Sequence, residues 1–218
     1  MKERRTGAER RGAADQTRGN LFVLVAPSGA GKTSLVMALL TREPNIRLSI
    51  SYTTRAPRAG EAHGRDYHFI ERAAFEAMIE RAEFLEHADV YGNYYGTSRK
   101  WIEEQLEGEH DVLLEIDWQG AAQVRRLFPH VVGIFVLPPS LEELRRRLEG
   151  RGKDSPEAIA RRMASAREEI SHVLEFEYII INERFESALD DLIAIVRAAR
   201  LSRAQQSHRL SKLIDQFK

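Results

Sequence analysis

A turn that contains two glycines and ends in Lys-Thr is the stretch whose residue types and spacing point most directly to chemistry. It reads Ala26-Pro27-Ser28-Gly29-Ala30-Gly31-Lys32-Thr33. Glycines allow backbone N–H groups to approach an anion, the lysine can reach β- and γ-phosphates, and the threonine hydroxyl can bind the Mg²⁺ that accompanies them. The usual pattern opens with glycine, whereas this one opens with Ala26. The turn predicts a site for a nucleoside triphosphate; an ordinary strand-to-helix turn is the alternative.

Two arginines three positions apart form a second candidate anion site. Arg55 and Arg58 follow the hydroxyl-bearing run 51–54 and precede Tyr67. An arginine fork binds phosphate through two hydrogen bonds, and a tyrosine hydroxyl adds another donor. The alternative is a solvated loop in which both arginines face water. In this setting we favour the anion site.

Charged side chains gather at two further places. Glu115 and Asp117 stand at the end of an apolar run, and carboxylates in such a place beside a phosphate loop commonly organise Mg²⁺ or its waters. A pair of exposed acids at a strand end is the alternative. A basic group, formed by Arg147, Arg151 and Arg162, surrounds a glycine-containing turn.

Alternating apolar and helical segments must position these side chains. Apolar, partly β-branched runs predict buried strands at residues 21–25, 112–116, 131–137 and 178–181. Helical patterns cover residues 34–40, 98–107, 121–127, 141–148 and 156–175. The alternation predicts an α/β fold with a mostly parallel sheet, in which ligands bind beyond the carboxyl ends of the strands.

Three segments depart from this alternation. Residues 49–95 predict a small mixed subdomain, with strand-like pieces at 48–52, 67–70 and 84–88 around a helix at 73–81. Residues 1–19 are rich in arginine and predict a disordered basic tail. An arginine-rich organelle transit peptide is the alternative, although Glu3, Glu9 and Asp15 argue against it. Residues 187–218 predict a helix with a solvated basic face.

The composition excludes several classes of function. The chain has 218 residues, 33 basic and 33 acidic, so its net charge of +0 calls for neither nucleic acid nor an acidic membrane as a partner. It contains no cysteine, which excludes disulfides, thiol nucleophiles and cysteine-bound metals. Its longest apolar runs are too short to span a bilayer. We therefore expect a cytoplasmic protein with no membrane or nucleic-acid partner.

From about residue 21 to residue 190 the chain resembles the guanylate kinases. The phosphate loop matches that family apart from Ala26, and residues 51–67 follow its acceptor-binding pattern. Further matches are Glu83-Phe84-Leu85-Glu86, Gly92-Asn93-Tyr94-Tyr95-Gly96-Thr97, Glu115-Ile116-Asp117-Trp118-Gln119-Gly120 and Arg147-Leu148-Glu149-Gly150-Arg151-Gly152. The Asp-Trp-Gln-Gly segment and the long C-terminal extension look like the bacterial branch.

The resemblance implies a three-layer P-loop kinase fold in residues 20–218, with an inserted GMP-binding subdomain and a helical lid. The core would comprise residues 20–48, 96–140 and 172–218, the α+β subdomain residues 49–95, and the lid residues 141–171. The implied reaction is direct transfer of the γ-phosphoryl group of ATP to GMP with Mg²⁺, in purine nucleotide metabolism. Whether the chain forms a homo-oligomer is left open.

The resemblance also assigns roles by position. Beside the phosphate loop, residues 26–33, Asn182 would contact ATP. The implied GMP-binding residues are Ser51, Arg55, Arg58, Tyr67, Glu86, Tyr95, Thr97 and Glu115. The implied catalytic residues are Lys32, Arg55, Asp117, Arg147, Arg151 and Arg162. Between the strand-end acids we favour Asp117, with Thr33, for the Mg²⁺ side and Glu115 for the acceptor side.

Two other functions compete with this interpretation. A related P-loop kinase could phosphorylate a different acceptor, although such an acceptor would not need Ser51 and Glu86 together. A non-catalytic guanylate-kinase-like module could bind phosphorylated peptides, but such modules lack a working phosphate loop, and Lys32 and Thr33 are both present here.

Overall fold

The computed structural model describes residues 19–90, 92–150 and 155–218. The basic tail predicted for residues 1–19 lies outside these ranges except for its last residue, and Arg151 lies outside them as well. The elements, in chain order, are β1 (Leu21–Val25), α1 (Lys32–Arg42), β2 (Ile46–Leu48), β3 (Tyr52–Thr53), β4 (His68–Phe69), α2 (Arg72–Glu80), β5 (Phe84–Val90), β6 (Asn93–Ser98), α3 (Arg99–Glu107), β7 (Asp111–Glu115), α4 (Trp118–Leu127), β8 (Val132–Leu137), α5 (Leu141–Glu149), α6 (Pro156–Ser171), the 3₁₀ turn η2 (Val173–Glu175), β9 (Tyr178–Ile181), α7 (Phe185–Arg200), α8 (Arg203–Arg209) and α9 (Ser211–Asp215).

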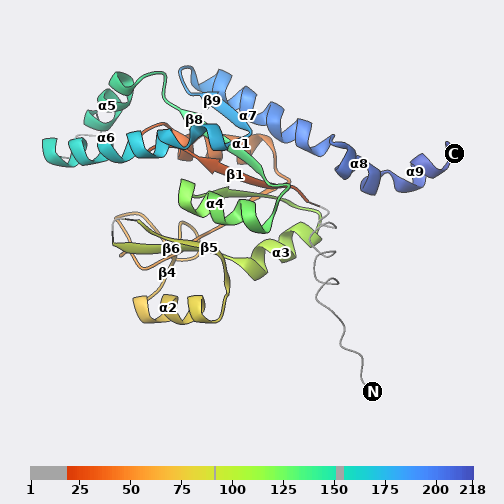
Figure 1. Cartoon of the computed structure of the whole chain (residues 1–218), viewed down its shortest axis with the longest axis horizontal. Coiled ribbons are helices and arrows are strands. Elements are labelled where there is room, and N and C mark those ends of the chain that lie inside the picture. Colours follow the sequence, from red (N-terminus) through yellow and green to blue (C-terminus); the bar gives the residue numbers. More distant parts are fainter. Residues whose placement is uncertain (1–18, 91, 151–154) are drawn as a thin grey trace.

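A parallel five-stranded sheet lies between two helical layers, as Figure 1 shows. Its strand order is β2-β7-β1-β8-β9, and each neighbouring pair is parallel. Strand β1 is buried on both faces: Phe22 and Leu24 pack toward α1 and α7, while Val23 belongs to the opposite cluster with α3 and α4. Alternate strand residues point to opposite faces, so an unbroken apolar run suits a central strand. The predicted α/β fold with a mostly parallel sheet is confirmed.

Strand β2 differs from the prediction. The sequence pattern placed residues 48–52 in the inserted segment, but Ile46–Leu48 pairs with β7 at the edge of the central sheet. Only Tyr52–Thr53 reaches the second sheet. The edge strand is three residues long, which is too short for periodicity to distinguish it from a loop.

The second sheet has the order β4-β3-β6-β5 and carries helix α2 on one face. The rings of Phe75 and Phe84 stack at 4.4 Å between the helix and the sheet. Gly96 lies against both rings. A Cβ atom at this position would come within 2.9 Å of each ring, so the packing requires glycine. Strand β6, which contains this glycine, was not predicted, since its residues Asn93–Ser98 have no apolar alternation.

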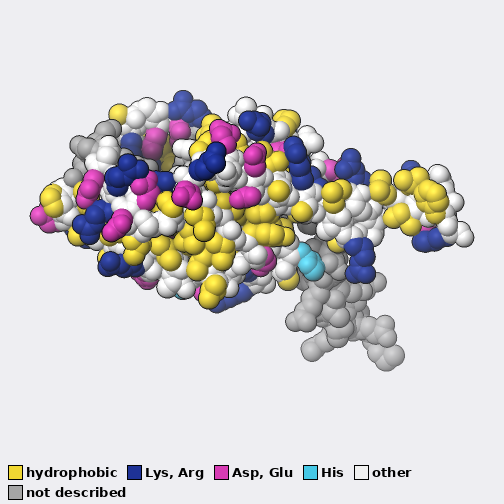
Figure 2. All heavy atoms as spheres, turned by 90° about the horizontal axis from the view of Figure 1, so that it is seen from above, with side chains coloured by type: hydrophobic (Ala, Val, Ile, Leu, Met, Phe, Trp, Pro, Cys, Tyr) yellow, Lys and Arg dark blue, Asp and Glu magenta, His cyan; other side chains and the backbone are white. Residues whose placement is uncertain are grey.

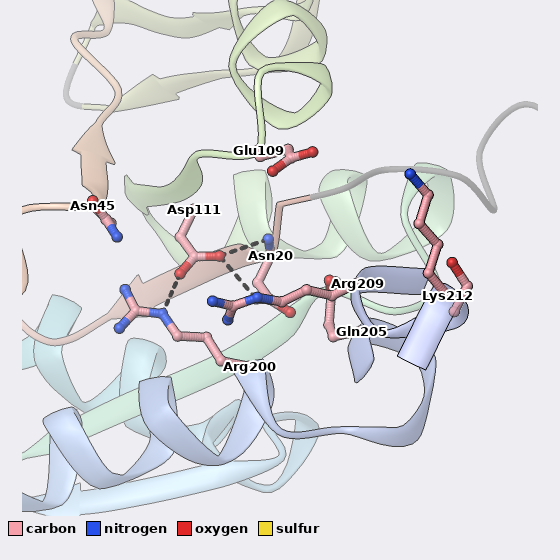
Figure 3. A pocket seen from close by; sticks show the side chains of 9 residues that line it. Asn20, Asn45, Glu109, Asp111, Arg200, Gln205, Arg209 and Lys212 are labelled. Atoms are coloured by element: carbon pink, nitrogen blue, oxygen red, sulfur yellow. Dashed lines mark hydrogen bonds and ion pairs between the residues drawn. The ribbon is translucent and has the colours of Figure 1, made fainter. Parts of the chain in front are cut away.

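The C-terminal end of helix α7 lies at the amino ends of strands β1 and β7. There Arg200 donates through Nε to Asp111 Oδ2 at 2.6 Å, and it also pairs with the buried Glu43. Asp111 Oδ1 accepts both the backbone and the side-chain N–H of Asn20, each at 2.8 Å. Figure 3 shows the part of this network formed by Asn20, Asp111 and Arg200, on the wall of a polar cavity of about 740 Å³. The network joins α7 to the starts of β1 and β7.

Helices α8 and α9 project from the body of the protein (Figures 1 and 2). They expose apolar side chains, among them Leu213 and, beyond α9, Phe217. Among the described residues, none of the helices is long and apolar enough to cross a membrane.

Candidate active site

The phosphate loop joins the carboxyl end of β1 to the amino end of α1. Gly29 and Gly31 have φ angles of +98° and +93°, a region that L side chains rarely adopt. Gly31 is the N-cap of α1, and no side chain caps the helix there. The first N–H groups of α1 therefore remain available to an anion, and the helix dipole favours negative charge at this end.

Two side chains reach from the loop to the end of β7. Lys32 Nζ donates to the carbonyl oxygen of Ile116 at 3.2 Å. The Thr33 hydroxyl donates to Glu115 Oε1 at 2.7 Å. Strands β1 and β7 are parallel neighbours, so their carboxyl ends meet at one edge of the sheet, and this brings residues more than 80 positions apart into contact.

Asn182 holds the backbone of the phosphate loop in place. Its side chain is only 4% exposed, and its Nδ2 donates to the carbonyl oxygen of Ala30 at 2.7 Å. A Cβ atom on Gly31 would lie 2.4 Å from that same nitrogen. The amide that the sequence assigned to ATP contact thus holds the backbone of the phosphate loop, and this close approach requires glycine.

A cavity of about 190 Å³ extends from the loop toward the second sheet. It is lined by Lys32, Ser51, Tyr67, Glu86, Ala88, Val90, Tyr95, Glu115, Ile116 and Asp117. Strands β5, β6 and β7 supply half of this lining. The sequence predicted seven of these residues as parts of the site, and the structure brings them to one cavity.

Glu86 is the most deeply buried carboxylate of the site. It is 3% exposed, and its Oε1 accepts the Thr97 hydroxyl at 2.6 Å. Burial raises the pKa of Glu86 to about 7; the hydrogen bond from Thr97 opposes this rise, and the nearby charge of Asp117 adds to it. A carboxyl group with such a pKa changes its charge near neutral pH.

The first turn of α4 forms the floor beneath Glu86. Asp117 is the N-cap of this helix, and its Oδ1 accepts the N–H of Gly120 at 2.8 Å. A Cβ atom on Gly120 would lie 2.5 Å from Glu86 Oε2 and 3.3 Å from Asp117 Oδ1. Glycine therefore lets the two carboxylates approach each other. The cap also explains why α4 begins at Trp118, three residues earlier than predicted.

The two strand-end acids thus have different neighbours. Glu115 contacts Thr33 of the phosphate loop, whereas Asp117 lies beside Glu86. The sequence favoured Asp117 as the partner of Thr33 on the Mg²⁺ side, but the Thr33 hydroxyl bonds to Glu115 instead.

Arg55 and Arg58 are both held by Glu61. Arg55 Nη2 donates to Glu61 Oε1 at 2.9 Å, and the backbone N–H of Arg58 donates to Glu61 Oε2 at 2.7 Å. The guanidinium of Arg55 also lies 5.4 Å from the centre of the Tyr67 ring. The hydrogen bond from Arg55 lowers the pKa of Glu61, which keeps this anchor charged. The side chain of Arg58 is exposed.

Helices α5 and α6 carry the remaining basic residues. Arg147 Nε donates to Glu143 Oε1 at 2.8 Å, and its Nη2 donates to the carbonyl oxygen of Asn182 at 3.0 Å. Leu144 and Leu148 pack against Gly29, where an added Cβ atom would lie 3.0 Å from each. Arg147 is therefore adjacent to the phosphate loop, and Arg162 is half-buried on α6.

The sequence analysis missed two acidic residues that hold these arginines. Glu61 lies inside the stretch already singled out, but its ion pair is with Arg55, six positions earlier in a loop, and its bond to Arg58 goes to the backbone N–H, so no regular spacing signalled it. Glu143 precedes Arg147 by four positions on a helix, the spacing at which opposite charges meet.

Comparisons with known proteins agree on one family. The sequence model described as Guanylate kinase matches residues 18–199. Similar proteins include the guanylate kinase of Dechloromonas aromatica, 61% identical over 91% of this chain and 98% of that protein, and that of Chromobacterium violaceum, 59% identical over 91% and 95%. The crystal structure of guanylate kinase from Anaplasma phagocytophilum superimposes with a TM-score of 0.73 at 38% identity and covers 88% of this chain and 92% of that one.

Proposed function

Because the chain belongs to the guanylate kinase family, we propose that it transfers the γ-phosphoryl group of ATP directly to GMP, giving ADP and GDP. One observation carries this proposal: Lys32 of the phosphate loop and the buried Glu86 line one and the same cavity. A donor site and an acceptor-base site that share one cavity suit transfer between two bound nucleotides.

On the donor side, the phosphate loop would hold the triphosphate of ATP with Mg²⁺. Thr33 Oγ1 and Glu115 Oε1 are hard oxygen donors 2.7 Å apart, and they suit an ion that prefers oxygen ligands and keeps several waters. When bound, Mg²⁺ supplies positive charge to the β- and γ-phosphates. We propose Thr33 and Glu115 as the residues on the Mg²⁺ side, and Asn182 as a support of the loop.

On the acceptor side, Glu86 would read guanine. Its carboxylate can accept from N1–H and the 2-amino group, a donor pair that adenine does not present on that edge. A buried carboxylate left unpaired by the wrong base is costly, so such a site discriminates strongly. We propose that Asp117 and Thr97 assist Glu86, that Ser51 contacts the guanine O6, and that Arg55, Arg58, Tyr67 and Tyr95 hold the GMP phosphate.

Phosphoryl transfer needs positive charge on the equatorial oxygens and an in-line arrangement, with little covalent work by the protein. Lys32 would supply charge from the phosphate loop, Arg55 from the loop that follows β3, and Arg147 and Arg162 from helices α5 and α6. Closure of residues 141–171 over ATP would exclude water, which otherwise hydrolyses the nucleotide. Residues 49–95 would serve as the acceptor subdomain. We place the enzyme in the cytoplasm and in purine nucleotide metabolism, with ATP and GMP as its partners.

A coupled ADP-release assay with GMP, AMP, UMP and dTMP tests the proposal. We expect turnover with GMP and at least a hundredfold less with the other acceptors. Lys32→Ala should abolish turnover while GMP still binds, as measured by calorimetry. Preference for another acceptor would instead identify a different P-loop kinase, and GMP binding without any turnover in the wild-type protein would identify a binding module.

A further inference from the structure

The C-terminal end of helix α6 is fixed to the first residue of α4 by two stacked rings. His172, the C-cap of α6, stacks on Trp118 with ring centres 3.7 Å apart and an angle of 11° between the planes. Stacked rings at this distance hold their two elements in a defined orientation. No role in the reaction assigned above uses either side chain.

A hydrogen-bonded network holds the imidazole in this orientation. His172 Nδ1 lies 2.6 Å from Glu175 Oε1, and Glu175 Oε2 accepts from Arg125 at 2.7 Å. Arg125 also donates to the carbonyl oxygen of Glu175 at 2.9 Å. Since Arg125 lies two turns after Trp118 on α4, the end of α6 is attached to α4 at two places.

The same turn of α4 forms the floor of the acceptor-base site. Trp118 directly follows Asp117, and Gly120 lies against Glu86. A shift of this turn on binding of guanine would therefore move the Trp118 ring and, with it, the stacked ring of His172. One turn before His172, Glu169 is half-buried, and burial raises its pKa while the charge of Lys32 opposes the rise. The end of α6 thus lies close to both halves of the active site.

Helix α6 carries Arg162 at a distance from this attachment. Ten residues separate Arg162 from His172, which corresponds to about 15 Å along a helix. A rotation of about 10° at His172 would therefore move Arg162 by about 3 Å, enough to make or break a contact with a phosphate.

We propose that the His172–Trp118 stack is the pivot that couples guanine binding at Glu86 to the position of the basic helix α6 over ATP. His172 is in this role a positioning residue, because it touches neither nucleotide. The proposal rests on the proposed function, since it assumes that GMP and ATP occupy the two ends of the cavity.

Calorimetry with Mg²⁺ and a non-transferable imido analogue of ATP tests the pivot. The measured quantity is the ratio of analogue affinities with and without GMP. We expect GMP to increase the affinity in the wild-type protein, and His172→Ala to lower the ratio about two- to tenfold, which is what an aromatic pair is worth. The affinity for each ligand alone should change less than twofold.

Three variants separate the ring from the rest of the side chain. His172→Phe keeps the stack and should retain the ratio, whereas His172→Gln keeps a hydrogen-bonding group without the ring and should lose it. Leu174→Ala, at a neighbouring position that is 87% exposed, should behave as wild type. These variants also replace His172→Ala should that protein fail to fold.

Fluorescence gives an independent readout of the stack. In a Trp101→Phe background only Trp118 emits. Addition of GMP should change its emission, and His172→Gln should remove most of that change. The pivot is rejected by a ratio that stays the same in His172→Gln, by failure of His172→Phe to retain it, or by the absence of coupling in the wild type. Normal phosphorylation of GMP alongside any of these results rejects only the pivot, whereas no phosphorylation rejects the proposed function.

Discussion

Lowering the pH from 8 to 6 should weaken GMP binding about tenfold, because the carboxyl group of Glu86 must be ionised to accept from guanine. Burial raises its pKa to about 7. At pH 8 about nine-tenths of the molecules carry the carboxylate, and at pH 6 about one-tenth do. The apparent dissociation constant equals the intrinsic constant divided by that fraction, which gives the tenfold change.

Calorimetric titration with GMP between pH 6 and 8.5 at constant ionic strength measures this dependence. The phosphate of GMP itself titrates near pH 6, so its contribution must be separated from that of Glu86. Thr97→Val removes the hydrogen bond that lowers the pKa of Glu86, and it should shift the profile to higher pH; Thr97→Ser should restore it. A dissociation constant that varies less than twofold from pH 6.5 to 8.5, or an unshifted profile in Thr97→Val, would refute the reasoning.

The same pKa predicts a stability effect that does not depend on ligand. The folded-state pKa of Glu86, about 7, exceeds its ordinary value of 4.5, so the folded protein binds more protons than the unfolded chain between these pH values. The stabilisation that follows from the raised pKa of Glu86 is complete below pH 4.5 and is lost as the pH rises through 7. At pH 8 the ionised Glu86 therefore costs about 3 kcal/mol, and Glu86→Gln should raise the free energy of unfolding by up to that amount, measured with urea. No gain at pH 8 would contradict the burial argument.

Other substitutions test the supports of the site. Glu61→Gln should raise KM for GMP about tenfold with a smaller change in kcat, because it weakens the charge-assisted anchor of the acceptor loop; an unchanged KM would show that the anchor is dispensable. Gly31→Ala should lower the free energy of unfolding by about 2 kcal/mol or more and weaken ATP binding, because the added Cβ atom meets Asn182. Gly60, with φ +88°, has open space around it, so Gly60→Ala should lower the free energy of unfolding only by the backbone strain of about 1 kcal/mol. Arg200→Met should lower the midpoint of urea unfolding, because the buried Glu43 and Asp111 each lose one charge-assisted hydrogen bond, at a cost of about 3 kcal/mol in total, with KM for GMP unchanged. A raised KM would mean that this edge of the sheet communicates with the site.

The sequence by itself determined the features that depend on neighbouring residues. The phosphate loop was recognisable because two glycines, a lysine and a threonine act within eight consecutive positions, and their backbone conformation is a local property. The central strand β1 was recognisable for a similar reason, since a strand buried on both faces is an unbroken apolar run. The order of the motifs was sufficient to indicate the family.

Only the tertiary structure decided which residues surround the carboxylates of Glu86, Glu115 and Asp117. Glu86 and Asp117 are 31 positions apart, and neither the burial of Glu86 nor the rise in its pKa is visible until α4 covers β5. The roles of Glu115 and Asp117 could not be separated by strand alternation, because β7 ends at Glu115 and Asp117 already caps the next helix. Burial and contact between segments far apart in the chain depend on the whole fold, and in this protein they bring the buried Glu86 into one cavity with Lys32 of the phosphate loop.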